Sequence, residues 1–246
     1  MKRKAKRRKS MSAKTADVWK RLFSLFANIM EMVVADKRSA EEVADVLQVI
    51  KSDKYFSLTL GRKTMCWPVK KQLDAWTKLY LEEFGIILDT SEIKIPIHQD
   101  GWNRLIVVAR GLTSEKIYQA MKKMMPAWKK WNNLDSVESI RKADKTYVVW
   151  VRDRVEADEE LKNNSANALK EKGVNCITIE ERLLLEMKYF METGKSLDIQ
   201  NWTLCAGSRR ADGCVPIVRR AGGEICVDGC NQGYTSEALL SRSVVS

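Results

Sequence analysis

The spacing of apolar residues changes near residue 90, and this change constrains the fold more than any other feature of the sequence. Before it, apolar side chains recur three and four residues apart, as in Leu73, Trp76 and Tyr80, which predicts amphipathic helices. After it come short β-branched runs, of which residues 104–110 and 147–151 are the densest. The sequence therefore predicts an α+β fold, with a helical N-terminal section followed by a mixed region around a small, mostly antiparallel sheet.

Composition shifts and turn signals divide the chain into four predicted parts. These are a disordered basic tail over residues 1–12, a helical section over 13–88, an α+β section over 89–234 and a loose, Ser-rich C-terminal tail over 235–246. The longest apolar stretch, residues 22–30, is interrupted too early to cross a bilayer, so we expect no transmembrane span. We interpret it as one face of an amphipathic helix, with attachment to an anionic membrane surface as an alternative.

Local signals place the individual elements. Helices are expected over residues 16–35, 39–51, 68–84, from Thr113 or Ser114 to near Pro126, over 158–171 and over 179–193, the last capped by Thr178. Strands are expected over residues 56–60, over 92–97 and 104–110 as one hairpin, over 147–151, and over 201–205, 214–219 and 224–227 as the small sheet.

The first nine residues are dominated by positive charge. The chain carries a formal net charge of +11, and seven Lys or Arg of this tail supply seven of those charges. Like charges at this density cannot pack a core but attract polyanions. The leading hypothesis is a non-enzymatic nucleic-acid-associated protein without a cofactor, which binds DNA or RNA through the tail residues Lys2, Arg3, Lys4, Lys6, Arg7, Arg8 and Lys9.

An Arg-rich loop offers a second anion contact. A glycine and a hydroxyl precede two adjacent arginines, and two more arginines follow on the returning strand. Guanidinium groups pair with phosphate in two parallel hydrogen bonds, and a hairpin could bring the two pairs together. The candidate anion-binding residues are Ser208, Arg209, Arg210, Arg219 and Arg220, although a hairpin with a basic exposed face explains the same pattern.

The segment Trp128-Lys129-Lys130-Trp131 is a further candidate. Aromatic rings beside lysines suit base stacking along a phosphate track. Two Trp three residues apart also share one side of an element and often pack inward, which we favour over stacking.

Two metal sites are minor alternatives to the absence of any metal. Asp153 and Glu156 follow a strand and could hold Mg²⁺, although nearby carboxylates also suit the start of a helix. Cys205, Cys214, Cys226 and Cys230 could form a zinc site, but the paired spacing of zinc knuckles is absent. Six Cys without a convincing secretory signal favour reduced thiols and a cytoplasmic location.

Two further function classes stay open. No nucleotide-binding glycine motif, zinc-protease motif or catalytic triad pattern occurs. An enzyme or binder acting on a phosphorylated substrate would need Asp153, Glu156, Ser208 and Arg209 around one pocket. A protein-interaction module would need a large exposed Trp and Met patch.

Three blocks and four shorter segments carry a resemblance. They are residues 104–113, 149–160 and 203–209, together with 165–167, 212–213, 215–216 and 242–246. These segments resemble an uncharacterised protein family of small-genome, Parcubacteria-like candidate-phylum bacteria, over most of the chain after about residue 90.

The family has no assigned activity, so the resemblance implies no reaction, cofactor or site. In its pattern an aromatic often follows the first arginine of the loop, and the positions of Cys226 and Cys230 need not be cysteine. Arg210 and the late cysteines depart from this pattern, which weakens the zinc hypothesis. The basic start is this chain's own addition.

Overall fold

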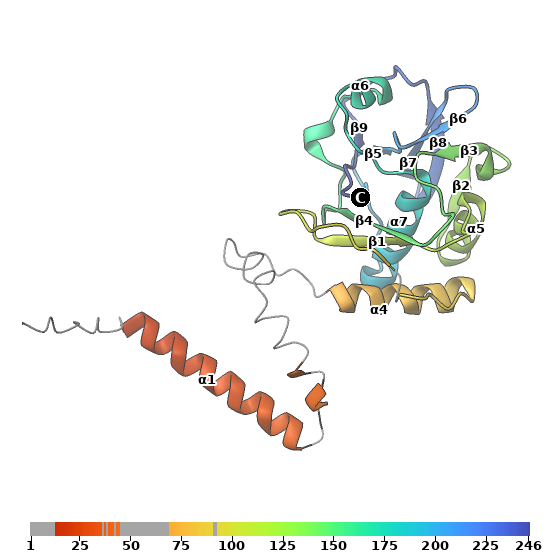
Figure 1. The fold of residues 1–246 in the computed structure, drawn as a ribbon. Helices are drawn as coiled ribbons and strands as arrows, with labels where there is room; N and C mark the ends of the chain where they lie inside the picture. Colours follow the sequence, from red (N-terminus) through yellow and green to blue (C-terminus); the bar gives the residue numbers. More distant parts are fainter. Residues whose placement is uncertain (1–12, 36, 38, 42, 45–68, 91–92) are drawn as a thin grey trace, which may run out of the picture. The chain divides into compact units, whose positions relative to one another are not determined.

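The computed structural model describes residues 13–35, 37, 39–41, 43–44, 69–90 and 93–246 (Figure 1). The chain divides into two compact units, Met1–Thr64 and Met65–Ser246. The division falls inside the predicted helical section 13–88, whose last helix belongs to the second unit. The predicted tail 1–12, the predicted strand 56–60 and most of the predicted helix 39–51 lie outside the described residues.

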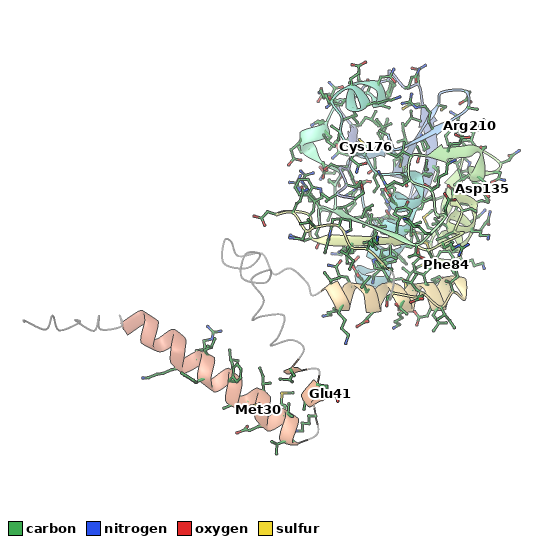
Figure 2. All side chains as sticks on the ribbon, viewed as in Figure 1. Met30, Glu41, Phe84, Asp135, Cys176 and Arg210 are labelled. Carbon is green, nitrogen blue, oxygen red and sulfur yellow. The ribbon has the colours of Figure 1, made fainter. Side chains whose placement is uncertain are left out.

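The described part of the first unit is mainly one helix, α1 (Ala13–Val34), as its apolar spacing predicts. Along it Leu22, Phe26 and Ile29 recur four and three residues apart, which places them on one side. Figure 2 shows the described side chains of α1, with Met30 among them, projecting from the ribbon.

The second unit begins with α4 (Val69–Leu79), which continues into a π-helical turn, η1 (Tyr80–Phe84). Gly85 ends this helix with a left-handed backbone, φ 64°, a conformation that glycine adopts without strain. Two aromatic side chains of the helix donate hydrogen bonds to the backbone of the next strand. The indole Nε1 of Trp76 donates to the Leu105 carbonyl at 3.0 Å, and the Tyr80 hydroxyl donates to the Val107 carbonyl at 2.7 Å.

The first strand, β1 (Arg104–Val108), pairs antiparallel with β4 (Tyr147–Val151). The predicted hairpin between residues 92–97 and 104–110 is therefore wrong, because the described residues of 92–97 form no strand. Alternation of apolar residues predicts an extended segment but does not specify its partner. Both α4 and α7 (Ile179–Thr193) pack against β1, so this strand is buried along most of its length.

The helices after β1 begin at the capping residues that the sequence predicts. Thr113 caps α5 (Ser114–Met124), and the Thr178 hydroxyl and the Glu181 carboxylate close a capping box at the start of α7. The single predicted helix over 158–171 is wrong. It is divided into a short 3₁₀ turn, η3 (Glu159–Leu161), and α6 (Ala166–Glu171), because Ser165 starts a new helix by accepting the Ala168 N–H.

The main sheet has five strands in the order β2 (Ala127–Lys129), β8 (Glu224–Cys230), β7 (Val215–Ala221), β5 (Trp202–Leu204) and β9 (Leu239–Ser241). The three central strands pair antiparallel and match the predicted segments. The edge strands β2 and β9 add in parallel, which their short sequences do not reveal. A separate antiparallel pair joins β3 (Val137–Ser139), which follows the 3₁₀ turn η2 (Leu134–Ser136), to β6 (Ser208–Arg210).

The C-terminal residues are ordered, so the loose tail predicted over 235–246 is wrong. Strand β9 lies within this range, and Val245 bridges to Trp150 in β4. Arg242 is 1% exposed and Val244 is 5% exposed. The segment is rich in serine, but Ser241 and Ser243 donate their hydroxyls to Leu204 and Asp158. Tertiary partners far away in sequence therefore order a segment whose composition favours flexibility.

The core of the second unit lies between α4, α5, α7 and the β1–β4 pair, with a smaller cluster where α6 covers the sheet. The α+β fold is thus confirmed. No helix in the described part of the chain is both long enough and apolar enough to cross a membrane.

Candidate functional site

A chain of hydroxyl groups surrounds the start of α7. The Ser208 Oγ accepts the N–H of Ile179 at 2.8 Å and lies 2.7 Å from the Ser139 Oγ. Ser139 donates to Glu180 at 2.6 Å, so Ser208 must supply the proton between the two serines. Ser114 donates to the other oxygen of Glu180 at 2.7 Å. Ser208 is therefore a buried part of the fold, and the expectation that it binds an external anion is wrong.

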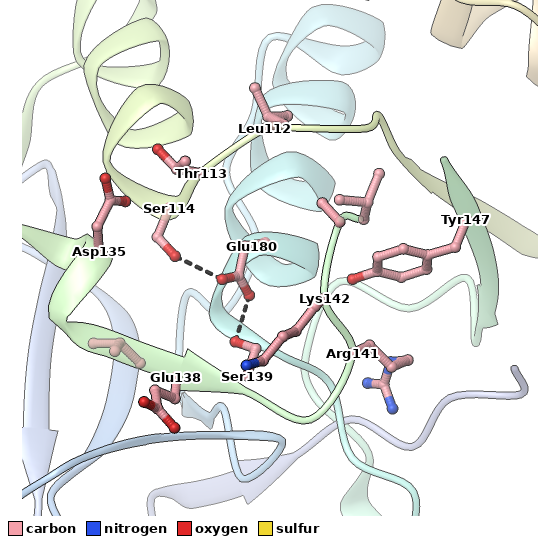
Figure 3. A pocket seen from close by; sticks show the side chains of 13 residues that line it. Leu112, Thr113, Ser114, Asp135, Glu138, Ser139, Arg141, Lys142, Tyr147 and Glu180 are labelled. Atoms are coloured by element: carbon pink, nitrogen blue, oxygen red, sulfur yellow. Dashed lines mark hydrogen bonds between the residues drawn. The ribbon is translucent and has the colours of Figure 1, made fainter. Parts of the chain in front are cut away.

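A cavity of about 260 Å³ opens beside this chain of hydroxyls, between α5, β3 and β4 (Figure 3). Glu180 lies in it between Ser114 and Ser139, and the acidic side chains of Asp135 and Glu138 also line it. Arg141 and Lys142 line the same space (Figure 3), so its charge is mixed and gives no clear preference for a phosphate. Both serine hydroxyls donate to the same carboxylate, that of Glu180.

Gly207 is required by packing rather than by a ligand. A Cβ at this position would lie 2.6 Å from the Cys176 carbonyl oxygen and 2.9 Å from that of Ile177. The Gly207 N–H donates to the Ile177 carbonyl at 3.0 Å. The backbone that approaches this glycine is therefore the protein's own.

The first two arginines of the loop contact different partners. Arg209 donates to Gln232 and, at 3.5 Å, to Asn167. Arg210 lies with its guanidinium carbon 4.9 Å from the centre of the Trp131 ring, and its Nε forms an ion pair with Asp212 at 3.4 Å. This Nε is buried and has no hydrogen-bond partner among the described residues.

Arg210 joins a second sequence candidate at the surface. Lys130, Trp131, Asn132, Asn133, Ser136 and Arg210 line a hollow of about 400 Å³, which we call the Arg210 hollow. Lys130 is half exposed and lies 3.2 Å from Asp228 in an ion pair. Trp128, on the edge strand β2, is 46% exposed. Lys130, Trp131 and Arg210, about 80 positions apart in the sequence, thus line one surface hollow, in which each cation is paired with an aspartate.

The second arginine pair lies elsewhere. Arg219 and Arg220 are in β7, whose first residue, Val215, follows the loop that carries Arg209 and Arg210. The second pair lies four and five residues further along this extended strand, about 13 Å or more from its start. Arg219 lies over the ring of Trp202, with 5.2 Å between the guanidinium carbon and the ring centre, and Arg220 is exposed. The expected convergence of the two arginine pairs across the hairpin is therefore wrong.

The two carboxylates of the alternative magnesium site have other partners. Asp153 accepts from Arg104 at 2.7 Å. Glu156 accepts the backbone N–H groups of residues 199, 200 and 201 at 2.9 to 3.1 Å, and so holds that loop in place. Neither carboxylate lines the cavity beside Glu180, so that cavity is not the shared pocket that a phosphorylated substrate would need.

The four cysteines of the alternative zinc site do not converge. Cys205 is fully buried, and burial raises its thiol pKa. Cys226 and Cys230 are separated by four residues of β8, about 13 Å. Burial, with a smaller effect from neighbouring Cys214, raises the pKa of Cys230 to about 11. No group of three or more metal-ligating side chains occurs among the residues that the structure describes.

A buried ion-pair network in the second unit was not anticipated from the sequence. Its four side chains have exposed fractions of at most 1% and form ion pairs at 2.6 to 2.7 Å. They are Arg182, Glu186, Asp198 and Arg242. Burial alone would raise the pKa of Asp198, but Arg242 and Arg182 outweigh it, so the pKa lies below its usual value. Arg182 and Glu186 are four residues apart on a helix, which is the one local signal of a pair.

Comparison with protein-family models, with curated proteins and with solved structures finds no match to this chain. The resemblance to a bacterial family therefore stays a prediction.

Proposed function

We propose that this protein is a non-enzymatic nucleic-acid-binding protein whose N-terminal cations provide most of the affinity and whose Arg210 hollow provides a second contact. The observation that carries the proposal is the placement of Arg210 beside Lys130 and Trp131 around one surface hollow. Guanidinium and ammonium groups beside aromatic rings are the side chains that contact phosphates and unstacked bases.

The distribution of charge supports this division of roles. Residues 1–64 contain 16 Lys or Arg and 7 Asp or Glu, whereas residues 65–246 contain 27 and 25. In the second unit several of these cations are paired with carboxylates, including Arg104, Arg141 and Arg182. Attraction to a polyanion therefore comes mainly from the first unit, and it weakens with salt because binding releases counterions.

The loop arginines differ in what they offer. Arg209 is held by Gln232 and Asn167, while Arg210 lines the hollow beside Lys130 and Trp131, with its Nε in an ion pair with Asp212. Arg210 is therefore the member of the loop that we assign to phosphate. We place the protein in the cytoplasm, where its five described cysteines stay unpaired as they are in the structure.

Fluorescence anisotropy with labelled single-stranded DNA, duplex DNA and RNA tests the proposal. We expect Lys130→Gln with Arg210→Gln to weaken binding by roughly a hundredfold, since each of the two phosphate contacts contributes about the energy of one charge-assisted hydrogen bond, a factor of about ten. The matched control is Arg219→Gln with Arg220→Gln, which removes the same charge from β7, outside the lining of the Arg210 hollow. Equal losses from both double variants would contradict a defined contact at the hollow.

A further inference from the structure

The apolar side of α1 is not explained by nucleic-acid binding. Leu25 is 53% exposed, Phe26 44% and Ile29 38%. Nucleic acid offers charge and stacked bases but no continuous apolar surface to a helix side. A second binding partner with a different chemistry is needed for these side chains, since a contiguous exposed apolar surface marks an interaction site.

The charges around this helix indicate which partner. Residues 1–34 contain ten Lys or Arg and only two Asp or Glu. Lys20 and Arg21 are exposed and belong to the same helix turn as Leu22. Long basic side chains beside an apolar stripe can place their stems on hydrocarbon and their charged ends among phosphates.

We infer that α1 lies in the surface of an anionic lipid bilayer, with the side that carries Leu22, Leu25, Phe26 and Ile29 among the acyl chains. An anionic bilayer supplies both features at once, an apolar layer and a negative surface. A short amphipathic helix binds weakly when it acts alone, and an adjacent basic segment supplies the second attachment that stable binding requires. The helix is not a transmembrane span, in agreement with the finding for the described helices.

The basic tail acts in both this proposal and the proposed function, but the apolar side acts only in this one. This difference separates the two experimentally. A substitution on the apolar side affects lipid binding alone, whereas a loss of tail charge weakens binding to lipid and to nucleic acid.

Co-sedimentation with vesicles tests the inference on the full chain. The probes are vesicles of phosphatidylcholine alone and of an equimolar mixture with phosphatidylglycerol. We expect binding to the mixed vesicles, and we expect Phe26→Ser with Ile29→Ser to weaken it by about a hundredfold, because burial of each of the two side chains contributes a factor of about ten or more. The matched control, Ala27→Ser with Asn28→Ser, introduces the same residue at adjacent positions and retains binding.

Three results would overturn the inference. One is binding to the mixed vesicles that Phe26→Ser with Ile29→Ser leaves unchanged, because the tail charges alone would then account for it. Another is a dimer in size-exclusion chromatography that this variant dissociates while the vesicles bind nothing, since the apolar side would then belong to a second copy. The third is a loss of nucleic-acid affinity in this variant that is as large as its loss of vesicle binding. Far-ultraviolet circular dichroism and thermal melting verify that each variant is folded.

Discussion

The carboxylate of Asp198 accepts a hydrogen bond from the guanidinium of Arg242 at 2.6 Å, and neither side chain is more than 1% exposed. Arg242 belongs to the C-terminal segment that follows β9, and it also donates to the carbonyls of residues 154 and 155. This contact connects the C-terminal segment to the middle of the second unit.

Replacing Arg242 should therefore destabilise the second unit strongly. Arg242→Met leaves a buried carboxylate with fewer partners, and we expect a loss of about 3–5 kcal/mol in the free energy of unfolding. Urea denaturation followed by fluorescence measures it. The control is Arg154→Gln, which breaks a surface ion pair with Glu160 and should cost at most about 1 kcal/mol. Similar losses in the two variants would refute the structural role of Arg242.

Acid should weaken the fold through Asp198. Its pKa lies below the value of an unfolded carboxyl, about 3.9, so the unfolded state binds more protons as the pH falls through that range. The stabilisation is present above this pH and is lost as the pH falls toward the folded pKa. We expect the free energy of unfolding to decline below about pH 5, and to decline less steeply in Asp198→Asn. Parallel pH profiles of the two proteins would show that another group controls acid stability.

Gly207 should tolerate no side chain. A Cβ there would lie 2.6 Å from a backbone oxygen that cannot rotate away, so we expect Gly207→Ala to cost at least about 1–3 kcal/mol. Gly233→Ala is the control, because its Cβ would meet only the Asn231 side chain at 3.5 Å. That variant should change stability by no more than about 0.5 kcal/mol. Thermal melting compares the two, and a stable Gly207→Ala protein would mean that the 176–177 backbone moves freely.

Much of the fold could be predicted because its signals are local. The capping box at Thr178 and the stop at Gly194 define α7, and Gly85 ends the first helix of the second unit. These devices act within one turn of the chain, so short patterns reveal them. The partner of β1 could not be predicted, because it lies about 40 positions further along the chain, beyond α5. No short sequence pattern indicates which distant strand pairs with β1.

The candidate site was predictable only in part for the same reason. The sequence singled out Arg210 and the Trp128–Trp131 segment separately, but only the fold brings Arg210 beside Lys130 and Trp131. Asp153 and Glu156 looked like ligands because their type suits a metal, while their actual partners, Arg104 and the 199–201 backbone, are more than 40 residues away. Residue type indicates what a side chain can bind, and tertiary structure decides what it does bind.

The salt dependence of nucleic-acid binding tests the central claim most directly. Anisotropy titrations of the full chain, of a variant lacking residues 2–9 and of Lys130→Gln with Arg210→Gln would be repeated over a range of salt concentrations. On duplex DNA the logarithm of the binding constant falls with the logarithm of salt concentration by about 0.9 for each phosphate contact. We predict that deletion of the tail lowers this slope by up to about 6 and that the double variant lowers it by about 2. Slopes that stay the same in all three proteins would contradict the account.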